Sequence, residues 1–286
     1  MRGAGVLDVA ALDRVRGHPR FGVALDEMAR LTVAMHRNQP LLNRLINDRG
    51  RLLMAAMALH LHFEEDGPGL TSARLQGLCV EQGVASPGRA AATIALMRWG
   101  GFLQPAPAPD RRMTRLAPTS AFLTSHRERL RNGLETLAVL WPEAQAVADR
   151  LDSPAMYQAM AQAQASRFLA GFRFGQACPE LMPLLDRNAG LVILFDLLVR
   201  EGETNASALA RRYGVSRAHA ADLLRAFTQE GEIRPAIRRD LERVVATVFL
   251  FNLGCAREAL AKAWQPTSGG DHLVHFGHQF AEVNGL

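Results

Sequence analysis

Hydrophobic residues recur at intervals of three and four through most of the chain, and this is the period of an amphipathic helix. The pattern predicts helices within residues 21–62, 72–102 and 119–175, and further helices at 190–200 and 241–263. Glycine and proline interrupt the pattern between these segments, where they are typical of turns and helix ends. The sequence therefore predicts a mainly α fold.

The interruptions divide the chain of 286 residues into five parts, and this length suits two domains at roughly 150 residues each. We expect an N-terminal helical segment, a first winged helix-turn-helix, a helical connector, a second helix-turn-helix, and a C-terminal helix with a tail. Their expected bounds are 1–47, 48–120, 121–187, 188–240 and 241–286. The expected architecture is two helix-turn-helix modules in tandem, joined and flanked by helices.

The clearest motif is SALARRYGVSRAHAADLLRAF, at residues 207–227. Leu209 and Ala210 are expected to pack inward from its first helix. Gly214 can take the positive φ of a tight turn without steric cost, and the Ser216 hydroxyl can cap the second helix. Each residue type fits its place in a helix-turn-helix.

The second helix of this motif has a small inward residue and a polar outer face. Ala220 is predicted to lie buried where the two helices cross, and Arg217, His219 and Arg225 are expected to face solvent or DNA. Asp222 lies on the same face and would repel phosphate unless another group balances its charge. Residues at the start of such a helix commonly meet DNA, so Ser216 and Arg217 are candidate contacts.

The same pattern occurs earlier, at residues 75–103, with one additional residue, Ala85, in the turn. The matched pairs are Leu78 with Leu209, Cys79 with Ala210, Gly83 with Gly214, Val84 with Val215, Ser86 with Ser216, and Ala90 with Ala220. The match continues from Ile94 and Leu224 to Leu103 and Ile233. We therefore predict that the chain contains an internal repeat of the helix-turn-helix.

Residues 50–130 resemble the winged-helix domain of MarR-type transcriptional regulators. The segment PDRRMTRLAPTSAFL, at 109–123, is similar to that family's wing, with Asp110-Arg111-Arg112 at its tip. The resemblance implies that the wing arginine reaches the minor groove and the second helix lies in the major groove. The residues that inherit these roles are Arg111 and Arg112 in the wing, and Ser86, Pro87 and Arg89 at the helix start.

The two copies differ in ways that bear on function. After the second copy, EGEIRPAIRRDLERV is too short for a full wing, and Pro235 limits any strand. Arg234, Arg238 and Arg239 are alternatives as a short basic loop. In the first copy, Ala90–Ala92 stand where base-reading helices often carry polar side chains. The second copy is thus also compatible with an assembly surface.

Charge favours a polyanionic partner. The chain has 33 basic and 28 acidic residues, a formal net charge of +5 and a pI of about 9.8. Residues 70–118 hold six arginines against two acids, and residues 205–240 hold seven against four. Both predicted modules are therefore net positive, as double-stranded DNA requires of a surface that binds it.

Other chemistry is not indicated. Cys79, Cys178 and Cys255 are odd in number and lack CxxC spacing, so we expect neither disulfides nor zinc. His60 and His62 would point to nearly opposite sides of a helix and cannot chelate together.

The tail has the spacing of a metal site, because His272, His275 and His278 follow one another at three-residue intervals. It lacks a helix-favouring start, and we expect no metal there. The chain shows no phosphate loop, nucleophile elbow or nucleophile–His–carboxylate pattern, so we expect neither an enzyme nor a cofactor.

The leading hypothesis is a DNA-binding transcriptional regulator that docks two helix-turn-helix modules on duplex DNA. The alternatives are a winged-helix interaction scaffold without DNA binding, and a helical protein that binds or converts a small molecule. A small apolar effector and a homodimer are left open as partners. No uninterrupted apolar stretch reaches the ~18 residues of a membrane span, and early charges interrupt any signal peptide. We expect a cytoplasmic protein with no membrane partner.

Overall fold

The computed structural model describes residues 9–38, 48–64, 67–107 and 114–263. Within these ranges the chain is mainly helical, as predicted, with two short antiparallel hairpins. The N-terminal part contains α1 (Val9–Arg16), α2 (Phe21–Asn38), α4 (Arg49–His62), α5 (Ser72–Glu81) and α6 (Pro87–Trp99). The middle contains α7 (Ser120–Ala138), α8 (Ala144–Ala148), α9 (Pro154–Leu169), the 3-10 helix η1 (Phe174–Gln176) and α10 (Met182–Leu185). The C-terminal part contains α11 (Gly190–Val199), α12 (Ala206–Tyr213), α13 (Arg217–Phe227) and α14 (Pro235–Ala263).

The two hairpins differ in length. β1 (Leu103–Ala106) pairs with β2 (Arg115–Pro118), with Leu103 opposite Pro118 and Ala106 opposite Arg115. The second hairpin, β3 (Thr228–Gln229) with β4 (Glu232–Ile233), has two residues in each strand. Glu230 and Gly231 close it, with φ values of 53° and 84°, and positive φ at both positions is typical of a tight two-residue hairpin turn.

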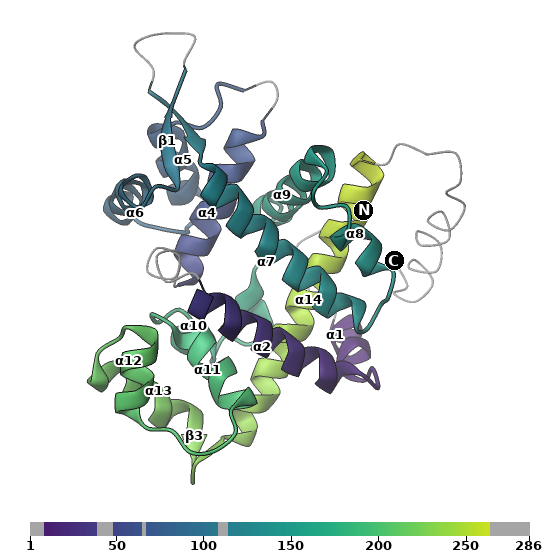
Figure 1. The fold of residues 1–286 in the computed structure, drawn as a ribbon, viewed down its shortest axis with the longest axis vertical. Coiled ribbons are helices and arrows are strands. Elements are labelled where there is room, and N and C mark those ends of the chain that lie inside the picture. Colours follow the sequence, from purple (N-terminus) through teal and green to yellow (C-terminus); the bar gives the residue numbers. More distant parts are fainter. Residues whose placement is uncertain (1–8, 39–47, 65–66, 108–113, 264–286) are drawn as a thin grey trace.

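Buried residues form two clusters, and each contains one of the predicted helix-turn-helix segments. The smaller cluster is formed by α4, α5, α6 and the hairpin β1–β2, together with Phe122, Ala161 and Phe168. The larger one combines α1, α2, α7 to α11, α12, α13 and α14. Phe63 and Leu123 pack against both clusters and join them. Figure 1 shows the corresponding arrangement, with α4 to α6 at one end and α11 to α13 at the other.

The long helix α14 lies at the centre of the larger cluster, where it packs against α9, α1 and α7. It begins at Pro235, earlier than the predicted Leu241, because proline is well tolerated in the first turn of a helix. Among the described residues it is the one helix long and apolar enough to cross a membrane, with a mean hydropathy of 1.5 in its best window. Because 56% of that window is buried and Phe249 and Ala256 are fully enclosed, the packing of this core accounts for its apolar residues.

Candidate nucleic-acid interface

Both predicted turns have the same backbone geometry. Gly83 and Gly214 have φ values of 65° and 64°, in the left-handed region that favours glycine. The N–H of Val84 donates to the carbonyl of Cys79 at 2.8 Å, and the N–H of Val215 donates to the carbonyl of Ala210 at 3.2 Å. The predicted correspondence of the two turns is therefore confirmed at the level of backbone hydrogen bonds.

The caps of the second helices also match. The Ser86 hydroxyl accepts the N–H of Arg89 at 3.4 Å, and the Ser216 hydroxyl accepts the N–H of His219 at 3.1 Å. These bonds satisfy an amide that would otherwise lack a partner in the first turn of each helix. The same local chemistry therefore starts α6 and α13.

Ala90 and Ala220 are both fully buried, as predicted for the two helix crossings. A larger side chain at either position would separate the helices, since interiors are packed without spare volume. The inward faces of α6 and α13 continue through the buried residues Thr93, Ile94 and Met97, and Leu223 and Phe227, respectively.

The first helices match less simply than predicted. Counted from the capping residues Thr71 and Asn205, the fully buried Leu209 corresponds to Leu75 and not to Leu78, which is only partly buried. The reason is length, because α5 has 10 residues and α12 has 8. Residues matched by their distance from the turn therefore face different directions toward the start of these helices.

The outer face of α6 carries two exposed arginines, Arg89 in its first turn and Arg98 in its last. Ser86, Pro87 and Arg89 are exposed at its start, where the sequence placed them. The Arg89 guanidinium, however, lies 3.0 Å from the carboxylate of Asp48, whose side chain is only 4% exposed. Asp48 also caps α4 by accepting the N–H of Arg51. Arg89 thus balances a buried carboxylate, a structural role that the sequence analysis did not foresee.

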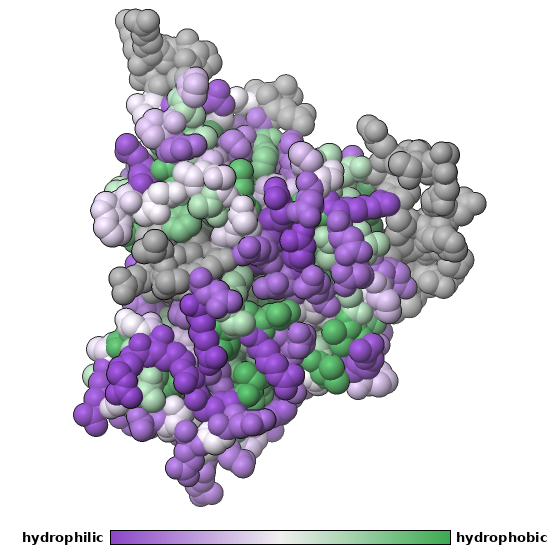
Figure 2. All heavy atoms as spheres, viewed as in Figure 1, coloured by the Kyte–Doolittle hydropathy of each residue, from purple (hydrophilic) through white to green (hydrophobic). Residues whose placement is uncertain are grey.

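The sequence analysis missed the exposed tryptophan at the end of α6. Trp99 is 82% exposed, and Ala91, Ala92 and Ala95 are exposed on the same helix. The helical period could have predicted this, because residues two apart on a helix point to nearly opposite sides, and Met97 points inward. Figure 2 shows a pale, weakly polar surface over α6 and a strongly hydrophilic one over α12 and α13.

The hairpin β1–β2 is fastened to the start of α5. The N–H of Leu116 donates to the carbonyl of Leu70 at 2.9 Å, and Thr71 forms a β-bridge with Arg115. Gly69, with a φ of 76°, lies against the Arg115 guanidinium, and a Cβ there would come within 2.2 Å of it. Arg111 and Arg112, predicted at the wing tip, lie outside the described residues.

Arg217 and Arg225 both lie on the exposed surface of α13. The Arg217 side chain forms neither a hydrogen bond nor an ion pair with any residue in the described part of the chain. The Arg225 side chain is 73% exposed and donates to Asp222 at 2.9 Å. Arg187 lies 3.7 Å from the same carboxylate. Two arginines therefore balance Asp222, and the repulsion of phosphate expected from it is reduced.

His219, predicted to face solvent or DNA, also has a contact within the chain. Its Nε2 atom lies 2.9 Å from the carbonyl oxygen of Asn188, and its side chain is only partly exposed. This contact fastens the start of α13 to the segment before α11. His219 is therefore a positioning residue in this structure.

Arg234 holds the short hairpin beside α13. Its guanidinium donates to the carbonyl oxygens of Thr228, at 3.1 Å, and Arg225, at 3.0 Å. Arg238 and Arg239 follow as exposed residues in the first turns of α14. The predicted basic segment thus has one arginine bound to the backbone and two on the surface.

Nothing in the described ranges groups three or more potential metal ligands, and the tail histidines lie outside those ranges. Burial lowers the pKa of His60 and of His62, so both favour the neutral form. Burial raises the pKa of the Cys79 thiol to about 12 and that of Cys255 to about 12. Such thiols stay protonated and are poor nucleophiles.

Comparisons with known proteins do not change this description: no protein-family model, curated protein or solved structure matches the chain.

Proposed function

We propose that this chain is a DNA-binding transcriptional regulator with two helix-turn-helix modules in tandem. In this proposal the first unit (α4, α5, α6 and hairpin β1–β2) is a MarR-like winged helix. The second unit (α11, α12, α13 and hairpin β3–β4) is a related module with a shortened wing. The observation that carries the proposal is the repeated geometry, in which a left-handed glycine, a capping serine and a fully buried alanine recur in both units.

The placement of the two candidate recognition helices supports a common DNA-binding face. In Figure 1, α6 and α13 lie on the same side of the molecule, toward its opposite ends. A single duplex presents successive major grooves on one face roughly 34 Å apart. Two modules in one chain would accept an asymmetric site, which a symmetric homodimer does not favour.

The second unit supplies most of the free positive charge. Exposed arginines with no printed ion pair among the described residues are Arg211 on α12, Arg217 on α13 and Arg239 in the adjoining first turns of α14, compared with Arg98 in the first unit. Arg225 and Arg238 are exposed as well but are paired with Asp222 and Glu242. Arginines of this kind bind phosphates without regard to sequence, and their contribution falls as salt rises. We therefore assign backbone binding chiefly to the second unit.

A mobility-shift titration on mixed-sequence duplex DNA, repeated over a salt series, tests the proposal. Arg217→Glu should weaken binding and flatten the salt dependence, since it replaces a free positive charge by a negative one. The matched control is Arg20→Glu, because Arg20 is exposed in the turn between α1 and α2 and belongs to neither unit. Absence of salt-dependent binding, or equal effects of the two substitutions, would defeat the proposal.

A second candidate function is assembly with another copy of the chain through α6. The exposed Trp99 and the alanines beside it favour it, because aromatic residues with an apolar surround are enriched at protein interfaces. Sedimentation velocity distinguishes this candidate from DNA binding. A dimer that Trp99→Ala converts to monomer would support it, and a wild-type monomer at micromolar concentration would exclude it.

A further inference from the structure

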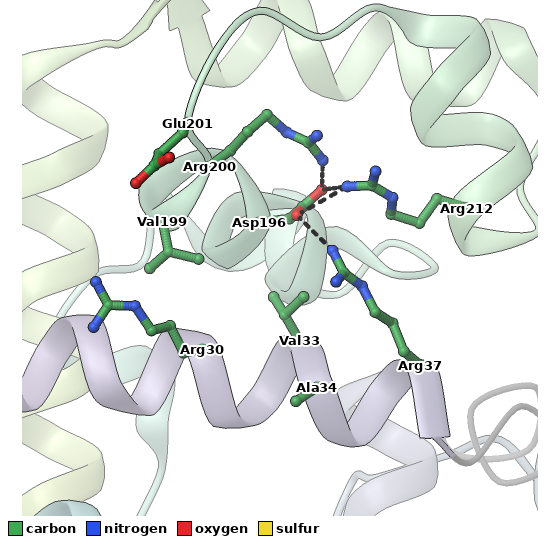
Figure 3. A pocket seen from close by; sticks show the side chains of 9 residues that line it. All are labelled: Arg30, Val33, Ala34, Arg37, Asp196, Val199, Arg200, Glu201 and Arg212. Carbon is green, nitrogen blue, oxygen red and sulfur yellow. Dashed lines mark hydrogen bonds and ion pairs between the residues drawn. The ribbon is translucent and has the colours of Figure 1, made fainter.

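An arginine-rich cleft lies between α2, α11 and the end of α12, at the base of the second unit. It has a volume of about 440 Å³ and is lined by the residues drawn in Figure 3: Arg30, Val33, Ala34, Arg37, Asp196, Val199, Arg200, Glu201 and Arg212. Four guanidinium groups and two carboxylates line it, so two positive charges have no counter-charge within the lining. An open cleft with this excess attracts anions.

Asp196 organises the arginines without using all their donors. Its carboxylate, 4% exposed, accepts from Arg200 and from Arg212, and lies 3.7 Å from Arg37. Each guanidinium has five N–H donors and meets Asp196 through one terminal nitrogen. The arginines are therefore held in place with donors left for a further acceptor.

The rest of the cleft sets the size and character of the ligand. Arg30 is an exposed residue of α2, and its side chain forms no hydrogen bond or ion pair with the described residues. Figure 3 shows it at the same end of the cleft as Glu201, away from the Asp196 group. Between these two ends the lining is apolar, from Val33 and Val199. This arrangement suits a compact apolar body that carries an oxyanion.

We propose that this cleft binds a small organic acid, in which a carboxylate or phosphate monoester pairs with Arg37 and Arg212 and the apolar body contacts Val33 and Val199. A carboxylate or phosphate can accept two parallel N–H bonds from one guanidinium, and such charge-assisted bonds are the stronger kind. Arg30 supplies a second positive charge for a doubly charged or more extended acid. The proposed ligand is acidic, in contrast to the apolar effector considered from the sequence.

Isothermal titration calorimetry with phenyl phosphate, benzoate and the neutral benzamide tests the proposal. At least one acid should bind at one site per chain with a Kd below about 1 mM, and benzamide should bind at least about tenfold more weakly. The double variant Arg30→Ala/Arg37→Ala should weaken acid binding by about tenfold or more, since hydrogen bonds from a guanidinium to a charged acceptor are the stronger kind. The preferred acid distinguishes a phosphate ligand from a carboxylate.

Arg239→Ala is the matched control, because Arg239 is exposed and lies outside the cleft. Far-UV circular dichroism confirms that each variant folds, and both cleft arginines are accessible enough to be replaced without opening the core. The proposal would be overturned if the double variant bound the acid as tightly as the wild type, or if benzamide bound as tightly as the acids. It would also be overturned if neither acid bound. The inference does not rest on the proposed DNA binding, because the titrations contain no DNA.

Discussion

The two units share their backbone design and differ in what surrounds it. The first has its own small core and a hairpin with four paired residues in each strand, and its second helix presents alanines and Trp99 outward beside Arg89 and Arg98. The second is built into the main core, its hairpin has two residues per strand, and its second helix presents arginines. The comparison teaches that two helix pairs can share their inward residues and differ in their outward ones, because only the inward residues are constrained by the helix crossing.

The largest difference between the two units should appear when a buried residue of one core is truncated, because each substitution destabilises mainly its own core. Phe227→Ala removes a fully buried ring from the main core and should lower the free energy of unfolding by about 3–5 kcal/mol. Met97→Ala should cost about 2–5 kcal/mol, confined mainly to the first unit, because Met97 belongs to the smaller core. Hydrogen exchange followed by mass spectrometry measures both effects, with peptides from α4 to α6 reporting the first unit. Equal loss of protection throughout the chain in both variants would show that the cores are not separate.

Acid should destabilise the region between the two units. Burial, and then the charge of Arg129, lowers the pKa of His126 to about 3 from a normal value of 6.5. The folded state therefore excludes a proton that the unfolded chain binds below pH 6.5, and stability present above that pH is lost as the pH falls toward 3. The slope from this group approaches about 1.4 kcal/mol per pH unit.

Urea denaturation between pH 7 and pH 5 measures this slope. His126→Gln should reduce the pH dependence, since Gln cannot take up the proton. His36, His60 and His62 also have pKa values lowered by burial and leave a remaining slope of the same sign. If His126→Gln left the pH dependence of the unfolding free energy unchanged, the acid sensitivity would belong to other groups.

The two turns should respond alike to the same substitution. Gly83→Ala and Gly214→Ala each force a side chain into the left-handed region, and each should cost about 1–2 kcal/mol. A Cβ at either glycine would meet no atom within 4 Å, so the backbone alone determines the cost. Thermal denaturation of the paired variants compares them, and a large difference would show that one turn is strained for another reason.

The smallest expected difference concerns DNA. Arg217→Ala should reduce the salt slope of DNA binding by about 1, as expected for one lost phosphate contact. Arg89→Ala should change that slope less, because Arg89 is already paired with Asp48. The measurement is again the mobility shift over a salt series. A greater loss for Arg89→Ala would assign the main DNA contact to the first unit.

The features that the sequence predicted well are local. The capping serines and the left-handed glycines act within a few residues of themselves, so their chemistry can be read directly from the sequence. The pairing of Arg89 with Asp48 and of His219 with Asn188 joins residues far apart in the chain, and it depends on how the helices pack. The cleft around Asp196 could not be foreseen either, because α2 and α11 are distant in sequence and no local pattern brings them together.

The position of α14 in the main core has a consequence for synthesis. Its residues pack against α1, from the beginning of the described chain, so the main core closes only when the ribosome has released α14. The smaller core needs nothing beyond Phe168 and can form while the remainder is still being made. Contacts between distant parts of a chain slow folding, since a long loop must close before they form. During synthesis the first unit can therefore fold early, whereas the second unit cannot complete its core until α14 has been made.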